Sequence, residues 1–245
     1  MSLDTLSTEI RTNLATVRAN ISDKCLAIGR TPETFPRLVA VSKTKPFEVV
    51  QVAYDCGHRS FGENYVQEIV EKACQLPPDI EWHFIGHLQS NKCKELVENV
   101  AGLHLVESVD SDRVASNLQK YVLKFRPTRP LGVLIQVNTS GQDSKSGVSP
   151  GAEVIALAQH ISTQCPLLRL RGLMTIGMPD YTSKPENFEC LVRCRKELAE
   201  AMGSPEAAPL FELSMGMSGD YVAAIEMGST NVRVGSAIFG SRVYP

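Results

Sequence analysis

The stretch Val39-Ala40-Val41-Ser42-Lys43-Thr44-Lys45-Pro46 is a short apolar strand that ends in a lysine, and Pro46 opens the next element. Side chains alternate along a strand, so Val39, Val41 and Lys43 share one face. Burying the ammonium of Lys43 there is costly unless its pKa falls or it forms a covalent bond. Both outcomes favour Schiff-base chemistry with an aldehyde. The plainer alternative is a lysine that reaches solvent from the strand end.

This strand begins a regular alternation of strand and helix patterns along the 245 residues. Strands are expected at 38–42, 60–61, 82–85, 103–106, 132–137, 169–172, 210–213 and 231–234. Helices are expected at 47–56, 64–74, 91–100, 112–125, 152–161, 187–202 and 220–227. Repeated βα units require parallel strands, and this series predicts an α/β fold with a (β/α)8 TIM-type barrel. A doubly wound open sheet is the alternative. The first strand is not followed by a GxGxxG motif, which argues against a dinucleotide-binding version of that fold.

An extra N-terminal helix is expected in front of the barrel. Its apolar residues recur at helical spacing and Gly29 is a suitable stop: Leu3, Leu6, Ile10, Leu14, Val17 and Ile21. The Pro- and Ser-containing patches at 182–186 and 203–209 are short enough to be ordinary connections. Without a linker-like boundary, the prediction is one domain over residues 1–245.

Two glycine-containing turns near the C-terminus have the composition of an anion site. They are Leu213-Ser-Met-Gly-Met-Ser-Gly-Asp220 and Gly228-Ser-Thr-Asn-Val-Arg-Val-Gly-Ser-Ala-Ile-Phe-Gly240. Each runs from a strand into a helix start, where backbone N–H groups favour a phosphate, although a capped helix with a tight loop is the simpler reading. In a closed barrel, strand eight lies beside strand one, which places these turns near Lys43. A lysine for an aldehyde beside a phosphate site suggests pyridoxal phosphate.

Composition excludes several classes of partner. The net charge is −2 with interspersed signs, so neither nucleic acid nor an anionic membrane is an expected partner. No apolar run approaches the roughly 20 residues of a membrane span. Asp4 and Glu9 make the N-terminus unlike a signal peptide or a transit peptide, so a cytoplasmic location is expected. The seven scattered cysteines contain no CxxC pair and are expected to be reduced.

Two further features have the composition of possible sites. His83 and His87 invite a metal reading, but their segment is expected to be a strand, and no third ligand is evident, so no metal site is predicted. The loop at 138–150 follows strand five on the active face. It is either a mobile lid over the cofactor, with Lys145 as a second amine, or an ordinary solvated loop.

Five motifs closely resemble the pyridoxal phosphate homeostasis protein family, also called proline synthase co-transcribed homologues. The resemblance runs in register from Arg37 to the end of the chain. Its motifs are Val39-Ala-Val-Ser-Lys-Thr-Lys, Phe61-Gly-Glu-Asn-Tyr-Val-Gln-Glu, Trp82-His-Phe-Ile-Gly-His-Leu-Gln-Ser-Asn-Lys, Gly172-Leu-Met-Thr-Ile-Gly and Leu213-Ser-Met-Gly-Met-Ser.

The resemblance implies a barrel similar to the N-terminal domain of alanine racemase, with pyridoxal 5'-phosphate bound covalently. Lys43 stands where the family has its Schiff-base lysine, and Arg233 matches the arginine that faces the pyridine nitrogen. The phosphate ligands of the family match Ser214, Gly235 and Ser236, with serine at the last position where many members have threonine. The residues on motifs that line the cofactor pocket are Asn64, Met174 and Met217.

Arg233 has a chemical consequence. Guanidinium has only donors and stays charged, so it can hydrogen-bond only an unprotonated pyridine nitrogen. An unprotonated ring is a poor electron sink, and enzymes that need a strong sink place a carboxylate there instead. Arg233 therefore favours holding the cofactor over exploiting it.

The resulting expectation is a non-catalytic, monomeric carrier that maintains vitamin B6 homeostasis and passes cofactor to apo-enzymes. The alternative is a small racemase that depends on pyridoxal phosphate. Racemases of the resembling class need a second base from a further domain and a dimer partner, and the chain ends at Pro245, directly after the expected barrel. An aldolase-type barrel using Lys43 on a sugar phosphate would explain the lysine and the phosphate turns, but not the five motifs.

Overall fold

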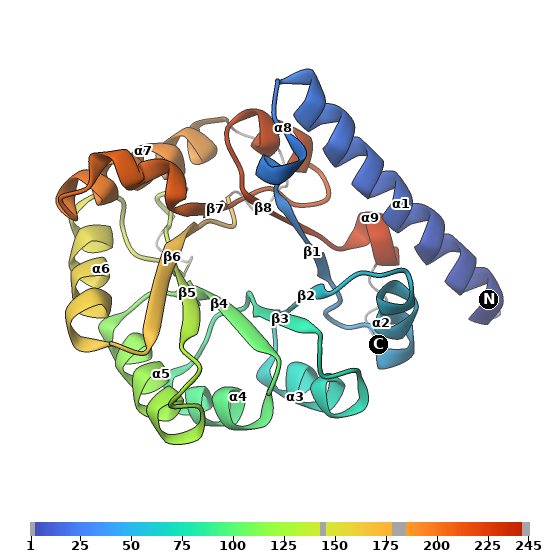
Figure 1. The fold of residues 1–245 in the computed structure, drawn as a ribbon, viewed down its shortest axis with the longest axis horizontal. Helices are drawn as coiled ribbons and strands as arrows, with labels where there is room; N and C mark the ends of the chain where they lie inside the picture. Colours follow the sequence, from blue (N-terminus) through green and yellow to red (C-terminus); the bar gives the residue numbers. More distant parts are fainter. Residues whose placement is uncertain (1–2, 143–145, 178–184, 242–245) are drawn as a thin grey trace.

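The computed structural model describes residues 3–142, 146–177 and 185–241. Parallel strands close into a barrel in the order β1-β2-β3-β4-β5-β6-β7-β8, as Figure 1 shows, so the TIM-type prediction is confirmed. The strands are β1 (Arg37–Val41), β2 (Ser60–Glu63), β3 (Glu81–Phe84), β4 (Leu103–Val109), β5 (Leu131–Gln136), β6 (Leu168–Met174), β7 (Glu212–Ser214) and β8 (Asn231–Val234). β1 pairs with both β2 and β8, and Val39 is aligned with Arg233.

Helices follow the strands and form the outer layer of the barrel (Figure 1). They are α1 (Leu3–Ala27), α2 (Phe47–Asp55), α3 (Val66–Gln75), α4 (Cys93–Asn99), α5 (Asp112–Phe125), α6 (Ala152–Gln164), α7 (Pro185–Ala201), α8 (Tyr221–Glu226) and α9 (Ser236–Phe239). Within the described ranges, none of the helices combines the length and the apolar character needed to cross a membrane. All seven cysteines lie in these ranges as free thiols.

The seventh strand begins later than its sequence pattern predicts. Expected from residue 210, it starts at Glu212, because Pro205–Leu210 forms a 3-10 helix. Pro209 lies inside that helix and has no N–H to donate to a strand ladder. Leu210, expected to be a strand residue, is 81 % exposed instead.

The expected N-terminal helix is present as α1, which crosses the outside of the barrel beside α8 and α9 (Figure 1). Its buried side includes Ile10, Leu14, Val17 and Ile21. The helix is followed by Gly29, whose φ of +78° lies in the left-handed region that glycine adopts without strain. This helix therefore covers the side of the barrel that carries β8 and β1.

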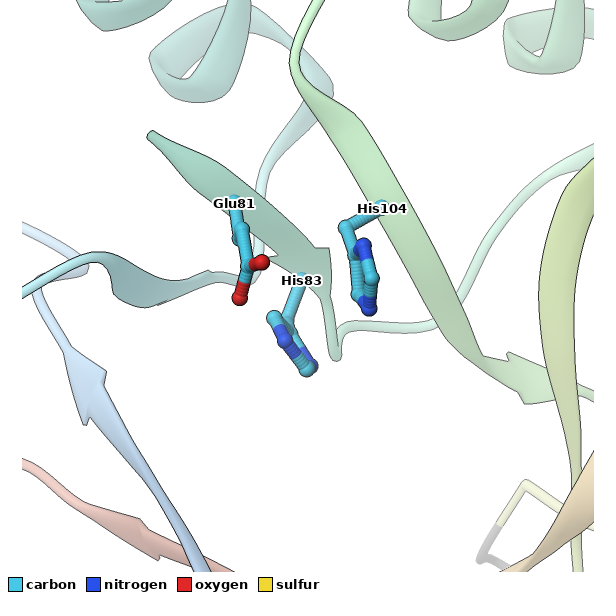
Figure 2. Close-up of side chains that lie close together, drawn as sticks. All are labelled: Glu81, His83 and His104. Atoms are coloured by element: carbon cyan, nitrogen blue, oxygen red, sulfur yellow. The ribbon is translucent and has the colours of Figure 1, made fainter. Parts of the chain in front are cut away.

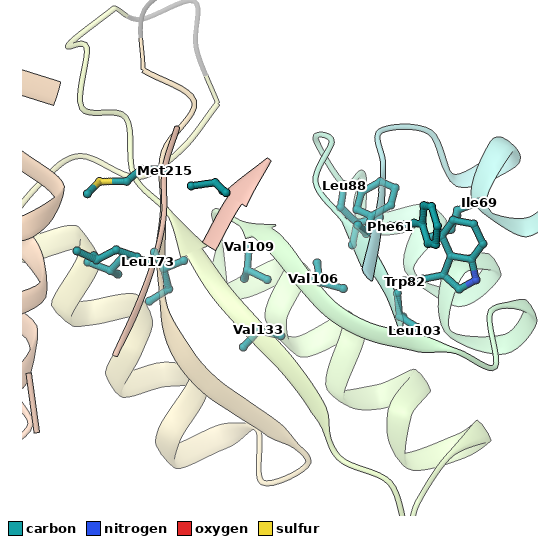
Figure 3. Packing of buried hydrophobic residues seen from close by; sticks show 14 of the residues in the cluster. Phe61, Ile69, Trp82, Leu88, Leu103, Val106, Val109, Val133, Leu173 and Met215 are labelled. Carbon is teal, nitrogen blue, oxygen red and sulfur yellow. The ribbon is translucent and has the colours of Figure 1, made fainter. Parts of the chain in front are cut away.

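Most of the hydrophobic core lies between the strands and the helices, where Phe61, Trp82, Leu103, Val133 and Leu173 pack in one large cluster (Figure 3). A separate apolar cluster consists of Leu105, Leu134 and Met174. The strands also bury charged and polar side chains, and these form one network below the barrel's C-terminal rim. Its members are His83, Glu107, Ser214, Asn231 and Arg233.

Candidate functional site

A cavity of about 530 Å³ opens beside the C-terminal ends of β1 and β8. This is the end at which barrels of this type carry their functional groups. The cavity is lined by five of the residues that sequence reasoning placed in a cofactor site, and they are Lys43, Met217, Arg233, Gly235 and Ser236. The fold thus brings the predicted lysine, arginine and glycine turn into one concave site.

Lys43 lies in the turn between β1 and α2, directly beyond the strand end. The next residue, Thr44, has a φ of +63°, a conformation that costs a non-glycine residue on the order of 1–3 kcal/mol. Two contacts hold this strained turn: the Thr44 N–H donates to Glu68 Oε2 at 2.8 Å, and the Ser42 carbonyl accepts from Lys72 Nζ at 2.9 Å. Side chains from α3 therefore fix the backbone that presents Lys43.

Lys72 on α3 also belongs to a buried ion pair with Glu63. Lys72 Nζ donates to Glu63 Oε1 at 2.7 Å, and the Ser42 hydroxyl donates to the same oxygen at 2.6 Å. Burial raises the pKa of Glu63 to about 7, against the opposing effect of Lys72 and Ser42. The packing therefore makes Glu63 the partner of Lys72 beside the Lys43 turn.

Arg233 presents its guanidinium to the cavity from β8 while remaining only 4 % exposed. Nη1 donates to the Ser214 hydroxyl at 2.5 Å, and Nη2 donates to the Thr175 carbonyl at 2.7 Å. Burial lowers the pKa of Arg233, and the negative charges of Glu107 and Asp220 oppose that shift. A guanidinium keeps its charge even so, and here it is held in one orientation.

Glu107 on β4 supplies the buried countercharge and was missed in the sequence. Its carboxylate accepts from the Ser214 hydroxyl at 2.5 Å and from Asn231 Nδ2 at 3.0 Å, and it lies 2.6 Å from His83 Nδ1. Burial alone raises the pKa of Glu107, but the hydrogen bond and charge of His83, the charge of Arg233 and the Ser214 hydrogen bond outweigh it and hold the pKa at about 2. The available signal was a lone carboxylate in the otherwise apolar run Leu103-His-Leu-Val-Glu-Ser-Val.

The turn between β8 and α9 presents backbone N–H donors to a hydrogen-bond acceptor. The Ser218 hydroxyl oxygen accepts from the N–H groups of Gly235 and Ala237 at 3.1 and 3.3 Å. A Cβ at Gly235 would lie 3.2 Å from the Val41 carbonyl oxygen, tighter than an ordinary contact, so glycine permits this turn to approach β1. The two N–H groups thus converge on one oxygen atom, which is the arrangement by which backbone N–H groups at a helix start bind an anion. Ser218 lies within a quoted motif but was not assigned a role.

Three predicted pocket residues lie outside the lining of this cavity. The Ser214 hydroxyl is fully buried between Glu107 and Arg233, so it contacts the arginine rather than the cavity. Met174 is buried against Leu105 and Leu134. The backbone of Asn64 lies against Gly86, where an added Cβ would be 2.0 Å from the Asn64 carbonyl oxygen.

The two histidines and the loop after β5 lie in separate surroundings. His83 lies beside Glu107, and His87 Nδ1 lies 3.3 Å from Asp110 Oδ2, so the two histidines have different carboxylate partners. The loop after β5 returns to the barrel through a bridge between Val137 and Val148. Lys145, considered as a second amine, lies outside the described residues.

Together, the closed barrel, the lysine after β1 and the turn of N–H donors after β8 define a barrel of the alanine racemase class. Residues 11–243 match the family described as alanine racemase, N-terminal domain. The alanine racemase of Bartonella henselae superposes with a TM-score of 0.70 over 96 % of this chain and 59 % of that one. The identity between the two is 16 %, so this likeness shows the fold alone.

More similar relatives identify the branch of that class. A pyridoxal phosphate homeostasis protein from Mus musculus is 50 % identical over 221 residues, covering 87 % of this chain and 79 % of the relative. One from Vibrio alginolyticus is 46 % identical over 244 residues, covering 96 % and 98 %. The structure of PipY from Synechococcus elongatus with PLP bound has a TM-score of 0.72 and 32 % identity, covering 94 % of this chain and 100 % of that one. The chain belongs to the pyridoxal phosphate homeostasis protein family, as its motifs predict.

Proposed function

We propose that this protein holds pyridoxal 5'-phosphate in the cavity beside β1 and β8 and serves as a carrier of that cofactor in vitamin B6 homeostasis. The observation that carries the proposal is that Lys43, Arg233 and the Gly235–Ser236 turn line one cavity. The names of the relatives and the PLP-bound structure of PipY support it. An amine, a guanidinium and a turn of N–H donors match the aldehyde, the ring nitrogen and the phosphate of this cofactor.

Each group has a distinct task in this arrangement. Lys43 supplies the amine for a reversible covalent link, and the strained turn held by Lys72 and Glu68 keeps that amine at the cavity. Arg233 donates toward a nitrogen lone pair. The backbone N–H groups of the β8–α9 turn and the Ser236 hydroxyl receive the phosphate. When bound, the cofactor brings an aldehyde and a conjugated ring that can stabilise a carbanion if its nitrogen is protonated.

The lining chemistry favours carriage over catalysis. Arg233 has no acceptor atom, so it cannot stabilise a protonated ring nitrogen. Among the described residues that line the cavity, the ionisable side chains are the cations Lys43, Lys45 and Arg233. Lys45 Nζ donates to the Ser241 carbonyl at 2.9 Å. The described lining contains no carboxylate, histidine or tyrosine that could act as a second base. A small racemase, the alternative function, would have to use Lys45 in that role.

We expect the carrier to work as a monomer, with apo-enzymes that use pyridoxal phosphate as recipients. The test loads the full-length protein with cofactor, reduces it with borohydride and maps the modified peptide. The expected adduct is on Lys43. It should be lost in Lys43→Ala and retained in the matched control Lys45→Ala. An adduct chiefly on Lys45 or Lys145 contradicts the assignment.

A second measurement separates carrier from enzyme. The loaded protein is incubated with L- and D-amino acids to follow racemisation, transamination and decarboxylation, and with an apo-enzyme to follow cofactor transfer. We expect transfer without turnover. Turnover at about 1 s⁻¹ or more, an ordinary enzymatic rate, would overturn the carrier proposal in favour of an enzyme.

A further inference from the structure

Three potential metal ligands meet at the end of the barrel opposite Lys43. Glu81 and His83 are two residues apart on β3 and therefore share one face of the strand. His104 lies near the start of the neighbouring strand β4 (Figure 2). One ligand atom from each side chain lies within 4.8 Å of the other two. Two imidazoles and a carboxylate from adjacent strands thus converge without any contribution from the cofactor cavity.

The contact of His83 Nδ1 with Glu107 orients the ring so that Nε2 can bind a metal. The ring is fully buried, and Nδ1 lies 2.6 Å from the Glu107 carboxylate, which can only accept a hydrogen bond while it is ionised. Nδ1 therefore holds its proton toward Glu107, and Nε2 is the nitrogen that a metal ion can take, with release of any proton it carries. Within the described part of the chain, that buried Nε2 has no hydrogen-bond partner. A carboxylate behind a metal-binding histidine fixes the tautomer and ring orientation in this way.

We propose that Glu81, His83 and His104 bind a divalent transition metal of the zinc type at the N-terminal end of the barrel. Two imidazole nitrogens and one carboxylate oxygen suit zinc, with water as the fourth ligand. The metal satisfies the orphaned nitrogen of His83 and connects β3 to β4. This site lies apart from the proposed cofactor function and does not depend on it.

Two existing contacts shape how a metal would enter. The Ser60 hydroxyl donates to Glu81 Oε2 at 2.9 Å, which leaves Oε1 for a metal. Arg171 Nη1 lies 3.1 Å from His104 Nε2 and competes for that ring. Arg171 is also ion-paired with Glu212, so it keeps a carboxylate partner after releasing His104. Metal binding therefore exchanges one arginine contact for one metal bond.

The test titrates Zn²⁺ into chelator-treated, full-length protein by calorimetry and repeats the titration with Co²⁺ to record the visible spectrum. The wild type is expected to bind one equivalent through nitrogen and oxygen ligands. Glu81→Gln and His104→Gln should each weaken binding by more than about 100-fold, since changes to residues behind the ligands already cost up to that much. His160→Gln, a control at a histidine that bonds Ser116 on the helical layer, should bind as the wild type does.

The Arg171→Gln variant should bind Zn²⁺ more tightly than the wild type, because it removes the donor that competes for His104. A misfolded variant would bind more weakly, so this result cannot come from misfolding. Absence of binding in the wild type, or wild-type affinity in both Glu81→Gln and His104→Gln, would overturn the proposal. A cobalt spectrum dominated by thiolate charge transfer would do the same, because it would assign the metal to cysteines.

Discussion

Glu107 and Arg233 carry opposite charges on β4 and β8, and one hydroxyl group joins them across the barrel. Ser214 donates to Glu107 Oε2 at 2.5 Å and accepts from Arg233 Nη1 at 2.5 Å. The carboxylate is thus one hydrogen bond removed from the cavity. It can orient the guanidinium and compensate its charge without touching a bound ring.

Replacing Glu107 with glutamine tests that role. The change keeps the shape but leaves Arg233 without its nearest buried countercharge. We expect a loss of roughly 3–5 kcal/mol in the free energy of unfolding, measured with urea, together with weaker retention of pyridoxal phosphate. The matched control is Glu98→Gln, which removes an exposed carboxylate paired with Lys94 and should change stability by less than about 1 kcal/mol. Equal stability of the two variants would contradict the countercharge role.

Replacing Ser236 with alanine tests the proposed phosphate turn. One charge-assisted hydrogen bond is worth roughly 1.5–3 kcal/mol, so the cofactor dissociation constant should rise by about 10- to 150-fold. Gly235→Val should weaken binding further, because its Cβ would already lie 3.2 Å from the Val41 carbonyl oxygen. Equilibrium dialysis measures both effects, with Ser162→Ala, at an exposed serine on α6, as control. Unchanged retention in both variants would remove this turn from the site.

The Lys72→Met variant tests how α3 supports the Lys43 turn. The substitution leaves Glu63 buried without its ammonium partner and releases the Ser42 carbonyl. We expect a loss of about 3–5 kcal/mol in stability and slower attachment of cofactor to Lys43. Lys94→Met, on the surface of α4, is the control. If Lys72→Met lost stability but attached cofactor at the wild-type rate, the turn would not depend on Lys72.

The raised pKa of Glu63 predicts a dependence of stability on pH. The folded protein holds the Glu63 proton up to about pH 7, whereas the unfolded chain releases it near 4.5, the ordinary pKa of a glutamate. Between these values the folded state binds more protons, so this group lowers the free energy of unfolding as pH rises. Glu63→Gln should remove that decline between pH 5 and 7, as measured by urea unfolding at several pH values. An identical pH profile in the variant would show that Glu63 does not titrate in this range.

The sequence by itself determined the barrel and the principal members of the cavity. Strand and helix periodicities differ, so the βα alternation is readable locally, and β8 lies at the predicted residues Asn231–Val234. The order of strands in a closed barrel then places the residue after β1 beside the turn after β8. Lys43 and Gly235 therefore share one cavity, as their positions along the chain indicate.

Only the tertiary structure decided which polar side chains meet inside the barrel. Glu107, Ser214 and Arg233 lie on strands β4, β7 and β8, and their contacts depend on strand stagger and side-chain direction across the barrel. A local pattern shows that a residue faces inward, but not the depth at which it meets a residue from another strand. The pairing of β3 with β4 also shifts register between Trp82 and His83. Regular alternation along each strand therefore could not predict that His104 lies beside Glu81 and His83.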